Sequence, residues 1–436
     1  MYIFFFSFLL ILILSFFIFN FHNFYKFKII KNEKDTNINP DDFLNLTDNE
    51  IINDIQKNLN EYYYPLKFNY TIKKFKSLLM NYNTQEDLSY KKNPILSIII
   101  PIYNGEKNIL NGLLSIGTQK LKNIEIIYID DHSIDNSINL IKEVQKIDKR
   151  IVLYENKINK GILYTRCFGI NKAKGKYIIS MDQDDLYINK YLFNILLNIA
   201  EEKKLDILNF EYVILNNKKF YFQKRFKKPN YNKIINNKEL SNIKNILSRK
   251  DYSFFTWDKL IKRNIYLSAL KLIENEYLNM YMNQEEDVCI TSCLLKIAKN
   301  FMKIKLFGYC YIESEFQWSV VLKFNRLNQT KIDKYVNSFF ESEKLLYKIT
   351  KNSKKEKLYV IQRLLDVLKY NKFVKKVNND YTKNLVLEVC SIFIKSKFTI
   401  NKNRKKIQRF VQQFKKINKP DYGPAAAPVG VKRLDD

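Results

Sequence analysis

A chain of 436 residues can hold one large domain or two of ordinary size. Hydrophobic residues make up 46% of it and aromatic residues 15%, which suffices for a substantial core and excludes wholesale disorder. The formal charge of +29 would suit a nucleic-acid-binding protein, but lysine is spread along the whole chain. The sequence also lacks paired zinc-ligand spacing, an aromatic RNP-like strand and a basic region leading into heptads, so we expect a solvated basic surface and no nucleic-acid partner.

The first 21 residues form an apolar run, with no charged side chain before Lys26. This is about the length of a helix that crosses a bilayer. No basic residue precedes the run and no small-residue cleavage site follows it, so an uncleaved anchor at 1–25 is favoured over a cleaved signal peptide. The anchor predicts a single-pass membrane protein of the endomembrane system (ER or Golgi). Its orientation stays open, because Lys26, Lys28 and Lys31 favour one direction and three N-glycosylation sequons favour the other.

A change of pattern at Ile95 separates a polar stem from an α/β domain. Residues 26–92 are rich in Asn, Lys and Asp and predict short helices rather than a domain. From Ile95, short β-branched runs alternate with helical segments, which predicts βαβ units and a mainly parallel sheet covered by helices on both faces. The predicted strands are 95–100, 124–129, 151–156, 177–180 and 207–215, and the predicted helices are 107–121, 135–147, 161–174 and 236–249.

The pattern from 330 to 416 is helical, basic and amphipathic, and predicts a C-terminal helical region. The last residues, DYGPAAAPVGVKRLDD, differ in composition from the rest and are interpreted as a disordered tail or a foreign addition. The five scattered cysteines favour buried free thiols over a zinc site. The predicted organisation is an anchor, a stem, an α/β domain, a helical region and a tail, at 1–25, 26–92, 93–325, 326–418 and 419–436.

Polar groups follow each predicted strand, at the edge where parallel α/β sheets bind ligands. In chain order they are Pro101 to Gly105, Asp130-Asp131, Asn159-Lys160-Gly161 with Arg166 in the next helix, and Asp182-Gln183-Asp184-Asp185. Such residues also cap helices and form turns, and Ser133 and Asp135 are expected to do so.

The fourth of these groups is distinct, because it places three carboxylates within four residues. Their mutual repulsion is costly unless a cation offsets it. Asp182 and Asp184, in D-x-D spacing at a strand end, suit Mg²⁺ or Mn²⁺ that also binds a diphosphate.

The segments PILSIIIPIYNGEKNI, IEIIYIDDHSIDNS and NKGILYTRCFGINKAKGKYIISMDQDD resemble the GT-A domain of family 2 glycosyltransferases in order and spacing. Trp257-Asp258-Lys259-Leu260 and Glu285-Glu286-Asp287 are similar to its acceptor-side motifs, so the resemblance covers about residues 95–315. It implies an α/β GT-A fold with a mixed, mainly parallel sheet. It also implies a glycosyltransferase, of the hexosyltransferase class, that moves one sugar from a nucleotide-diphosphate sugar (a UDP-sugar) to a glycan, protein or lipid acceptor.

The resemblance also implies roles for individual residues. Tyr103 and Asp130 would contact the base, Asp131 would support their loop, and Arg166 would neutralise or position the nucleotide. Asp182 would meet the ribose or sugar and, with Asp184, the Mn²⁺ or Mg²⁺, while Asp185 would give local support. Asp287, preceded by Glu286, would be the general base of an inverting reaction. The full donor-binding set is Pro101, Tyr103, Asp130, Asp131, Arg166 and Asp182.

Two departures from the family pattern keep alternatives open. The chain has only His22 and His132, so no late histidine completes a metal shell, and it has no Q-x-x-R-W motif, which argues against a processive synthase. A catalytically impaired nucleotide-sugar-binding protein therefore remains an alternative. A nucleotidyltransferase is disfavoured, because the loop Pro101–Lys107 is not the expected Gly-rich, Arg/Lys-containing one. Asp287 could also belong to a surface acidic cluster that opens a helix.

Overall fold

A computed structural model describes most of the α/β domain and parts of the flanking regions. The described residues, apart from a few single positions, are 47–62, 72–216, 219–222, 231–236, 253–273, 280–283, 285–313, 329–350, 380–396 and 401–417. The predicted anchor at 1–25, the predicted tail at 419–436 and nearly all of the predicted helix 236–249 lie outside them.

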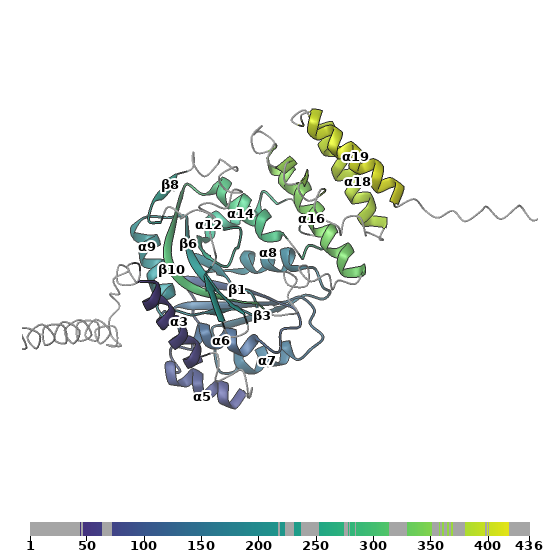
Figure 1. The fold of residues 1–436 in the computed structure, drawn as a ribbon. Coiled ribbons are helices and arrows are strands. Elements are labelled where there is room, and N and C mark those ends of the chain that lie inside the picture. The colour runs from purple at the N-terminus through teal and green to yellow at the C-terminus, as the bar shows by residue number, and fades with distance from the viewer. Residues whose placement is uncertain are drawn as a thin grey trace, which may run out of the picture.

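A ten-stranded mixed sheet forms the centre of the described fold (Figure 1). Its order is β3-β2-β1-β4-β9-β6-β10-β5, with β7 paired to β6 and β8 paired to β10. Strands β3, β2, β1 and β4 run parallel, β9 is antiparallel to both of its neighbours, and β6 and β10 are again parallel. The strands are β1 (Leu96–Ile102), β2 (Ile124–Asp130), β3 (Ile151–Glu155), β4 (Tyr177–Ser180), β5 (Leu186–Tyr187), β6 (Ile207–Asn216), β7 (Lys219–Phe222), β8 (Ile234–Asn236), β9 (Lys259–Lys262) and β10 (Asn300–Ile312).

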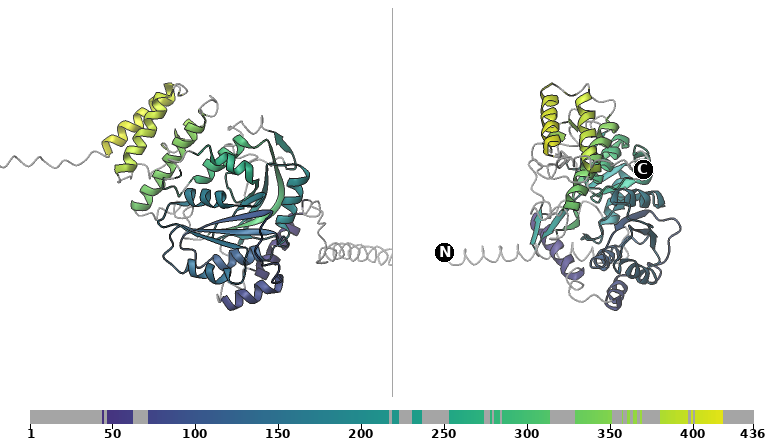
Figure 2. Two further views of the ribbon diagram at one scale, coloured as in Figure 1. Left: turned by 180° about the vertical axis from the view of Figure 1, so that it is seen from behind. Right: turned by 90° about the vertical axis from the view of Figure 1, so that its right-hand side faces the viewer.

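Helices cover both faces of this sheet, as the sequence predicts (Figure 2). Alternate residues of β1 enter different cores: Ile98 and Ile100 pack with α5, α6, α7 and α9, whereas Ile99 packs with α8, α12 and α14. This explains why the strand is apolar at every position except Ser97. The helices are α3 (Asp48–Tyr62), α5 (Ile72–Tyr82), α6 (Ile109–Gly117), α7 (Ser137–Gln145), α8 (Ile162–Lys172), α9 (Leu192–Glu202), α12 (Arg263–Leu270), α14 (Glu286–Ile297), α16 (Gln329–Ile349), α18 (Asp380–Lys395) and α19 (Asn401–Ile417).

The C-terminal helices α16, α18 and α19 extend the core on the α8 side of the sheet. Val336 and Phe340 of α16, Val389 of α18 and Phe410 of α19 belong to the same buried cluster as Ile99. The predicted helical character of 330–416 is confirmed where the structure describes it. All five cysteines are buried free thiols, as predicted.

Part of the predicted stem packs directly on the α/β domain. Phe75 and Leu79 of α5 are buried in the same core as α6, and a Cβ on Gly117 would come within 2.3 Å of Leu79 Cδ1. The amide of Asn83 donates hydrogen bonds to the carbonyl oxygens of Leu79 and Gly117 at 2.8 and 2.9 Å. Glycine at 117 is therefore what lets α5 approach α6 so closely.

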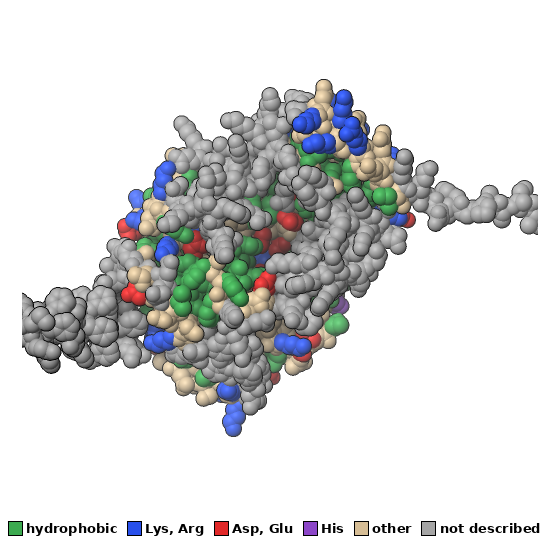
Figure 3. Space-filling view, viewed as in Figure 1, with side chains coloured by type: hydrophobic (Ala, Val, Ile, Leu, Met, Phe, Trp, Pro, Cys, Tyr) green, Lys and Arg blue, Asp and Glu red, His purple; other side chains and the backbone are tan. Residues whose placement is uncertain are grey.

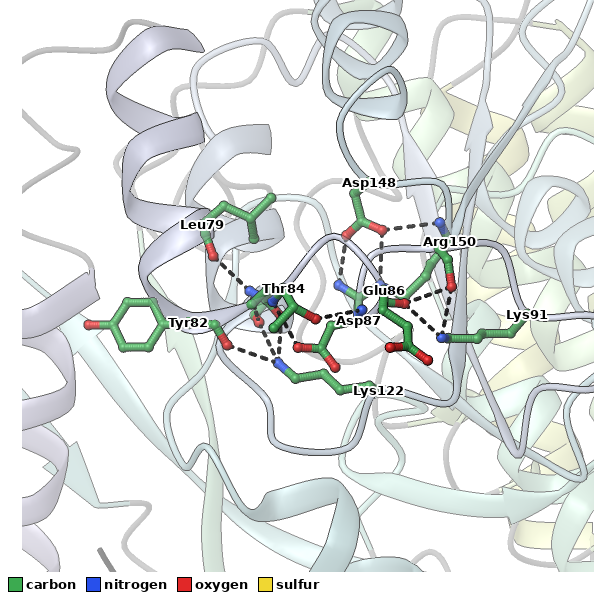
Figure 4. Close-up of polar contacts among 12 residues, drawn as sticks. Leu79, Tyr82, Thr84, Glu86, Asp87, Lys91, Lys122, Asp148 and Arg150 are labelled. Atoms are coloured by element: carbon green, nitrogen blue, oxygen red, sulfur yellow. Dashed lines mark hydrogen bonds and ion pairs between the residues drawn. The ribbon is translucent and has the colours of Figure 1, made fainter. Parts of the chain in front are cut away.

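A polar network beside α5 completes this contact (Figure 4). Lys122 donates to Asn83 Oδ1 and to the carbonyl oxygen of Tyr82, and burial, followed by the charge of Arg150, lowers the pKa of Lys122 to about 8. Arg150 forms a buried, bidentate ion pair with Asp148, at 2.9 and 2.7 Å. Such charge-assisted pairs fix geometry, so this corner of the domain is held in one arrangement.

The predicted localisation needs correction. No helix among the described residues is both long and apolar enough to cross a bilayer. The 21-residue helix α16, for example, carries Lys, Asp and Glu along its length, and such charges are costly in hydrocarbon. The description of the chain as a single-pass endomembrane protein with a transmembrane helix is corrected on this finding.

The packing of α5 predicts a stability effect at Leu79. Leu79→Ala should lower the free energy of unfolding by about 2–4 kcal/mol, because it removes a buried side chain that fills the space over Gly117. Urea unfolding measures the change. Lys76→Ala, on the exposed side of the same helix, is the control and should change stability by less than about 0.5 kcal/mol. Equal effects of the two substitutions would contradict the packing of α5 on the domain.

Candidate functional site

The carboxyl ends of β1, β2 and β4 meet at one edge of the sheet. Ile102, the last residue of β1, lies beside Asp130, the last residue of β2, and the acidic turn 182–185 follows β4. On the face shown in Figure 3, acidic side chains gather in a hollow near the middle, next to a group of hydrophobic side chains. The predicted convergence of polar loops on one edge is therefore what the structure shows.

The two aspartates at the end of β2 differ in their hydrogen bonds. Asp130 is fully buried, and its Oδ2 accepts a hydrogen bond from the Ser133 N–H at 2.9 Å. Its Oδ1 is buried without a hydrogen-bond partner among the described residues. Because an unpaired buried acceptor is costly, Oδ1 is a position where a ligand N–H or O–H would bind.

Asp131, in contrast, has its carboxylate fully engaged with the loop before α8. It accepts hydrogen bonds from the N–H groups of Lys160 and Gly161, both at 2.8 Å, and from the Asn156 amide at 2.9 Å. Gly161 has φ +84°, and a Cβ there would meet Met282 backbone atoms at 3.0 Å, so this turn requires glycine. Asp131 therefore positions a loop.

The side chain of Gln183 joins the loop after β1 to the acidic turn. Its Oε1 accepts from the Tyr103 N–H at 2.9 Å, and its Nε2 donates to the Tyr103 carbonyl at 3.2 Å. The side chain of Tyr103 is left 46% exposed, while Pro101 is buried within β1. An exposed aromatic ring on a fixed backbone is well suited to stacking on a ligand ring.

The acidic turn itself is held by β10. The Tyr309 hydroxyl donates to Asp185 Oδ2 at 2.8 Å and accepts from the Asp182 N–H at 3.0 Å. Asp185 Oδ1 accepts from the Ile312 N–H at 2.8 Å. Burial, followed by the charges of Asp184 and Asp182, raises the pKa of Asp185 well above its ordinary value. Asp185 is thus a structural clamp, and the half-buried Asp182 and Asp184 form the outer part of the turn.

Arg166 lies beneath the acidic residues. It is completely buried, and its Nη2 contacts Asp182 Oδ1 at 3.0 Å and Glu286 Oε1 at 3.5 Å. Its Nε and Nη1 are buried without hydrogen-bond partners among the described residues. The guanidinium therefore joins the turn after β4 to the first residue of α14, two segments more than 100 positions apart in the chain.

Glu286 and Asp287 form the first turn of α14, as part of the acidic site rather than of an isolated surface cluster. Burial, followed by the neighbouring charge of Asp287, raises the pKa of Glu286 to about 8, although Arg166 opposes this shift. Burial raises the pKa of Asp287 to about 6, opposed by Arg166 and by the Thr256 hydroxyl, which donates to Oδ1 at 2.8 Å. Near neutral pH, Glu286 is mostly protonated and Asp287 mostly ionised, so Asp287 is the proton acceptor of the pair.

The described residues contain no group of three His, Cys, Asp or Glu side chains arranged to hold a metal ion. In the turn 182–185, Asp185 accepts a hydrogen bond from Tyr309 of β10, and Asp182 forms an ion pair with Arg166. The described residues alone therefore do not supply a complete set of metal ligands at the predicted D-x-D site. Asp182 and Asp184 supply hard carboxylate oxygens of the kind that Mg²⁺ and Mn²⁺ bind, and the rest of a coordination shell would have to come from a substrate.

Three residues of this site were missed by the sequence analysis: Gln183, Thr256 and Tyr309. Gln183 lies within one recognised motif and Thr256 beside another, but only the fold shows that they bond to the Tyr103 backbone and to the Asp287 carboxylate, respectively. Tyr309 lies in β10, a strand that the sequence analysis did not predict. His132, in the loop after β2, is exposed and has φ +68°.

The raised pKa of Glu286 predicts how stability depends on pH. The folded state binds this proton more tightly than the unfolded state, whose pKa is near 4.5, so the stabilisation is complete below pH 4.5 and is lost as pH rises through about 8. In the wild type, this proton makes the free energy of unfolding fall by up to about 1.4 kcal/mol for each pH unit. Glu286→Gln should remove that fall. Urea unfolding between pH 5 and 8 measures it. The exposed control Glu202→Gln should keep the wild-type slope, and a wild-type slope in Glu286→Gln would refute the assignment.

Comparison with known proteins shows which family part of this chain resembles. A model of glycosyl transferase family 2 matches residues 97–257. An uncharacterized glycosyltransferase of Haemophilus influenzae is 28% identical over 213 residues, which cover 48% of this chain and 75% of the relative. Glycosyltransferase GlyA of Streptococcus pneumoniae is 31% identical over 209 residues, covering 46% of this chain but only 30% of that protein.

Among solved structures, S. aureus TarS 1–349 in complex with UDP is similar with a TM-score of 0.45 and 16% identity, covering 74% of this chain and 90% of that one. A likeness at this level does not bear on function. The sequence match instead covers β1 to Trp257, and so includes the loops after β1, β2 and β3 and the acidic turn. Residues 97–257 therefore resemble glycosyl transferase family 2, and the relatives that match this part of the chain are glycosyltransferases.

Proposed function

We propose that the protein transfers a single sugar from a nucleotide-diphosphate sugar to an acceptor hydroxyl, with inversion at the anomeric carbon. The observation that carries this proposal is the position of Arg166, which contacts both Asp182 of the acidic turn and Glu286 beside Asp287. The acidic turn and the Glu286-Asp287 pair thereby lie next to the same guanidinium nitrogen, Nη2. In-line attack needs a base for the acceptor and charge stabilisation for the leaving group close to one another, and this contact brings the two together.

The donor base would bind between Tyr103 and Asp130. The exposed ring of Tyr103 offers a stacking surface, and the unpaired Oδ1 of Asp130 is an acceptor for a ring N–H. Uracil carries such an N–H on its pairing edge, so a UDP-sugar is the donor that fits this pair best. Asp131 and Pro101 would contribute by fixing the loops on which the pocket depends.

The diphosphate of the donor would meet an acidic environment. Asp182, Asp184 and Asp287 outnumber the single buried guanidinium of Arg166, so an anionic diphosphate needs a further positive charge. Asp182 and Asp184 would hold Mg²⁺ or Mn²⁺ jointly with the donor phosphates, and the ion would offset the charge that develops on the departing diphosphate. Arg166 would keep Asp182 in position for this role.

Asp287 would be the general base. Its carboxylate takes the proton of the acceptor hydroxyl as that oxygen bonds to the anomeric carbon, and the bond from that carbon to the diphosphate oxygen breaks. The acceptor would be a glycan, protein or lipid hydroxyl. The absence of a Q-x-x-R-W motif supports transfer of one sugar rather than processive synthesis. In this proposal residues 93–325 form the transferase domain, and 326–418 form a helical region beside it.

Asp184→Asn tests the metal and donor part. The substitution removes the charge that would hold the cation, so we expect at least a 100-fold loss of kcat while the melting temperature stays close to that of the wild type. The assay measures nucleoside diphosphate release from a panel of nucleotide-sugars with Mn²⁺ or Mg²⁺. Asp380→Asn makes the same chemical change at an exposed position of α18 and should retain full activity. Full activity of Asp184→Asn would refute the metal role.

Asp287→Asn tests the base. Wild-type kcat should fall as pH drops through about 6, where Asp287 takes up a proton. Asn cannot accept a proton, so Asp287→Asn should lose about 100-fold or more of kcat with little change in donor KM, and the acidic limb should disappear. Glu286→Gln mimics a protonated neighbour and should lose much less activity near neutral pH. Proton NMR of the product, showing the anomeric configuration opposite to that of the donor, checks inversion.

A further inference from the structure

We propose that Thr256 is a positioning residue for the base: its hydroxyl and N–H hold Oδ1 of Asp287, which leaves Oδ2 to take the acceptor proton. This inference rests on the proposed function. Thr256 Oγ1 donates to Asp287 Oδ1 at 2.8 Å, and the Thr256 N–H contacts the same oxygen at 3.3 Å. Two donors on one oxygen fix the rotation of the carboxylate, which a flexible side chain at the start of a helix would not fix by itself.

Thr256 is well suited to this task because it cannot move freely. Its side chain is completely buried, and a β-branched side chain has few rotamers. Asp287 is only half-buried, so part of this residue remains accessible. A rigid, buried donor is thus paired with a partly accessible acid.

The segment that carries Thr256 is itself held by a buried charge network. Lys259 Nζ donates to Asp258 Oδ1 at 2.6 Å, to Ser253 Oγ at 2.8 Å and to the Phe255 carbonyl, and the side chains of Lys259 and Asp258 are fully buried. Thr291 of α14 donates to the Phe254 carbonyl at 2.7 Å, so the segment is also tied to the helix that bears Asp287. These bonds stabilise the segment without contacting the Asp287 carboxylate.

An aromatic stack links the same segment to the donor side. Trp257 lies between Phe255 and Tyr309, with ring centroids 4.5 and 4.4 Å apart and interplanar angles of 15° and 10°. The hydroxyl of Tyr309 bonds to Asp182 and Asp185. Thr256, which contacts Asp287, is therefore the neighbour in sequence of Trp257. Trp257 in turn packs against Tyr309, which holds the acidic turn.

Charged and titratable groups from several elements face Asp287. They are Arg166 of α8, Asp182 of the acidic turn, Lys259 of β9, Glu286 of its own helix and Tyr266 of α12. Thr256 differs from these groups in that it donates a hydrogen bond directly to the carboxylate. Loss of that bond disfavours the ionised form, so the pKa of Asp287 should rise and the acidic limb of kcat should move to higher pH.

The test compares Thr256→Val, Thr256→Ser and Thr291→Val in the full-length chain. Thr256→Val should lower kcat by roughly 10- to 100-fold, leave donor KM within about threefold and move the acidic limb to higher pH. Thr256→Ser restores the hydroxyl and should return kcat to within about threefold of wild type. Thr291→Val removes an equally buried hydroxyl from the same loop contact without touching Asp287, so it should lower the melting temperature but keep the wild-type pH profile.

Two results would overturn the positioning role: a Thr256→Val enzyme that matches Thr291→Val in kcat and pH profile, or a Thr256→Ser enzyme as impaired as Thr256→Val. If the wild type releases no nucleoside diphosphate with any donor, the proposed transferase function fails instead. The positioning role is then decided by ¹³C NMR of aspartate carboxyl groups, with the Asp287 signal assigned from Asp287→Asn. Thr256→Val should raise its titration midpoint, and an unchanged midpoint would refute the role.

Discussion

The site depends on one buried guanidinium. Arg166 has no exposed surface, and its Nη2 contacts acidic side chains from two distant segments, Asp182 and Glu286. A buried cation is tolerated only when it is paired, and its charge in turn offsets the repulsion between the acids packed around it. The end of β4 and the start of α14 therefore cannot separate without removing a partner from the buried guanidinium.

Around this centre, environment rather than residue type decides what each acid does. Asp185 is bound to Tyr309 and the Ile312 N–H, so it shapes the turn, whereas Asp182 and Asp184 stay half-buried. Asp131 likewise holds a loop while its neighbour Asp130 keeps an unpaired oxygen. Neighbouring acids thus differ in how their carboxylates are engaged, a difference that depends on which hydrogen-bond donors surround each carboxylate.

The sequence predicted the parallel half of the sheet well because its strands are short, apolar and separated by amphipathic helices. Strand β4 was predicted at its observed bounds, and β1 and β2 within two residues. The other half, in which strand directions are mixed, was missed where pairing is set by distant partners: β9 lies between β4 and β6, and the 13-residue β10 pairs with β5, β6 and β8. The same limit applies to the site. The acids could be found from motif spacing, but Arg166 as their shared partner, and Thr256 and Tyr309 as their supports, required the fold.

The contact between Leu79 and Gly117 has a practical consequence for where this enzyme can be cut. A recombinant fragment that starts at residue 93, where the sequence pattern changes, would lack Phe75 and Leu79 and would expose the glycine-lined surface of α6 to solvent. Uncovered apolar surface of this kind promotes aggregation. The autonomous folding unit therefore begins no later than Ile72, some twenty residues before the first strand, and a protease-resistant core would be expected to retain α5.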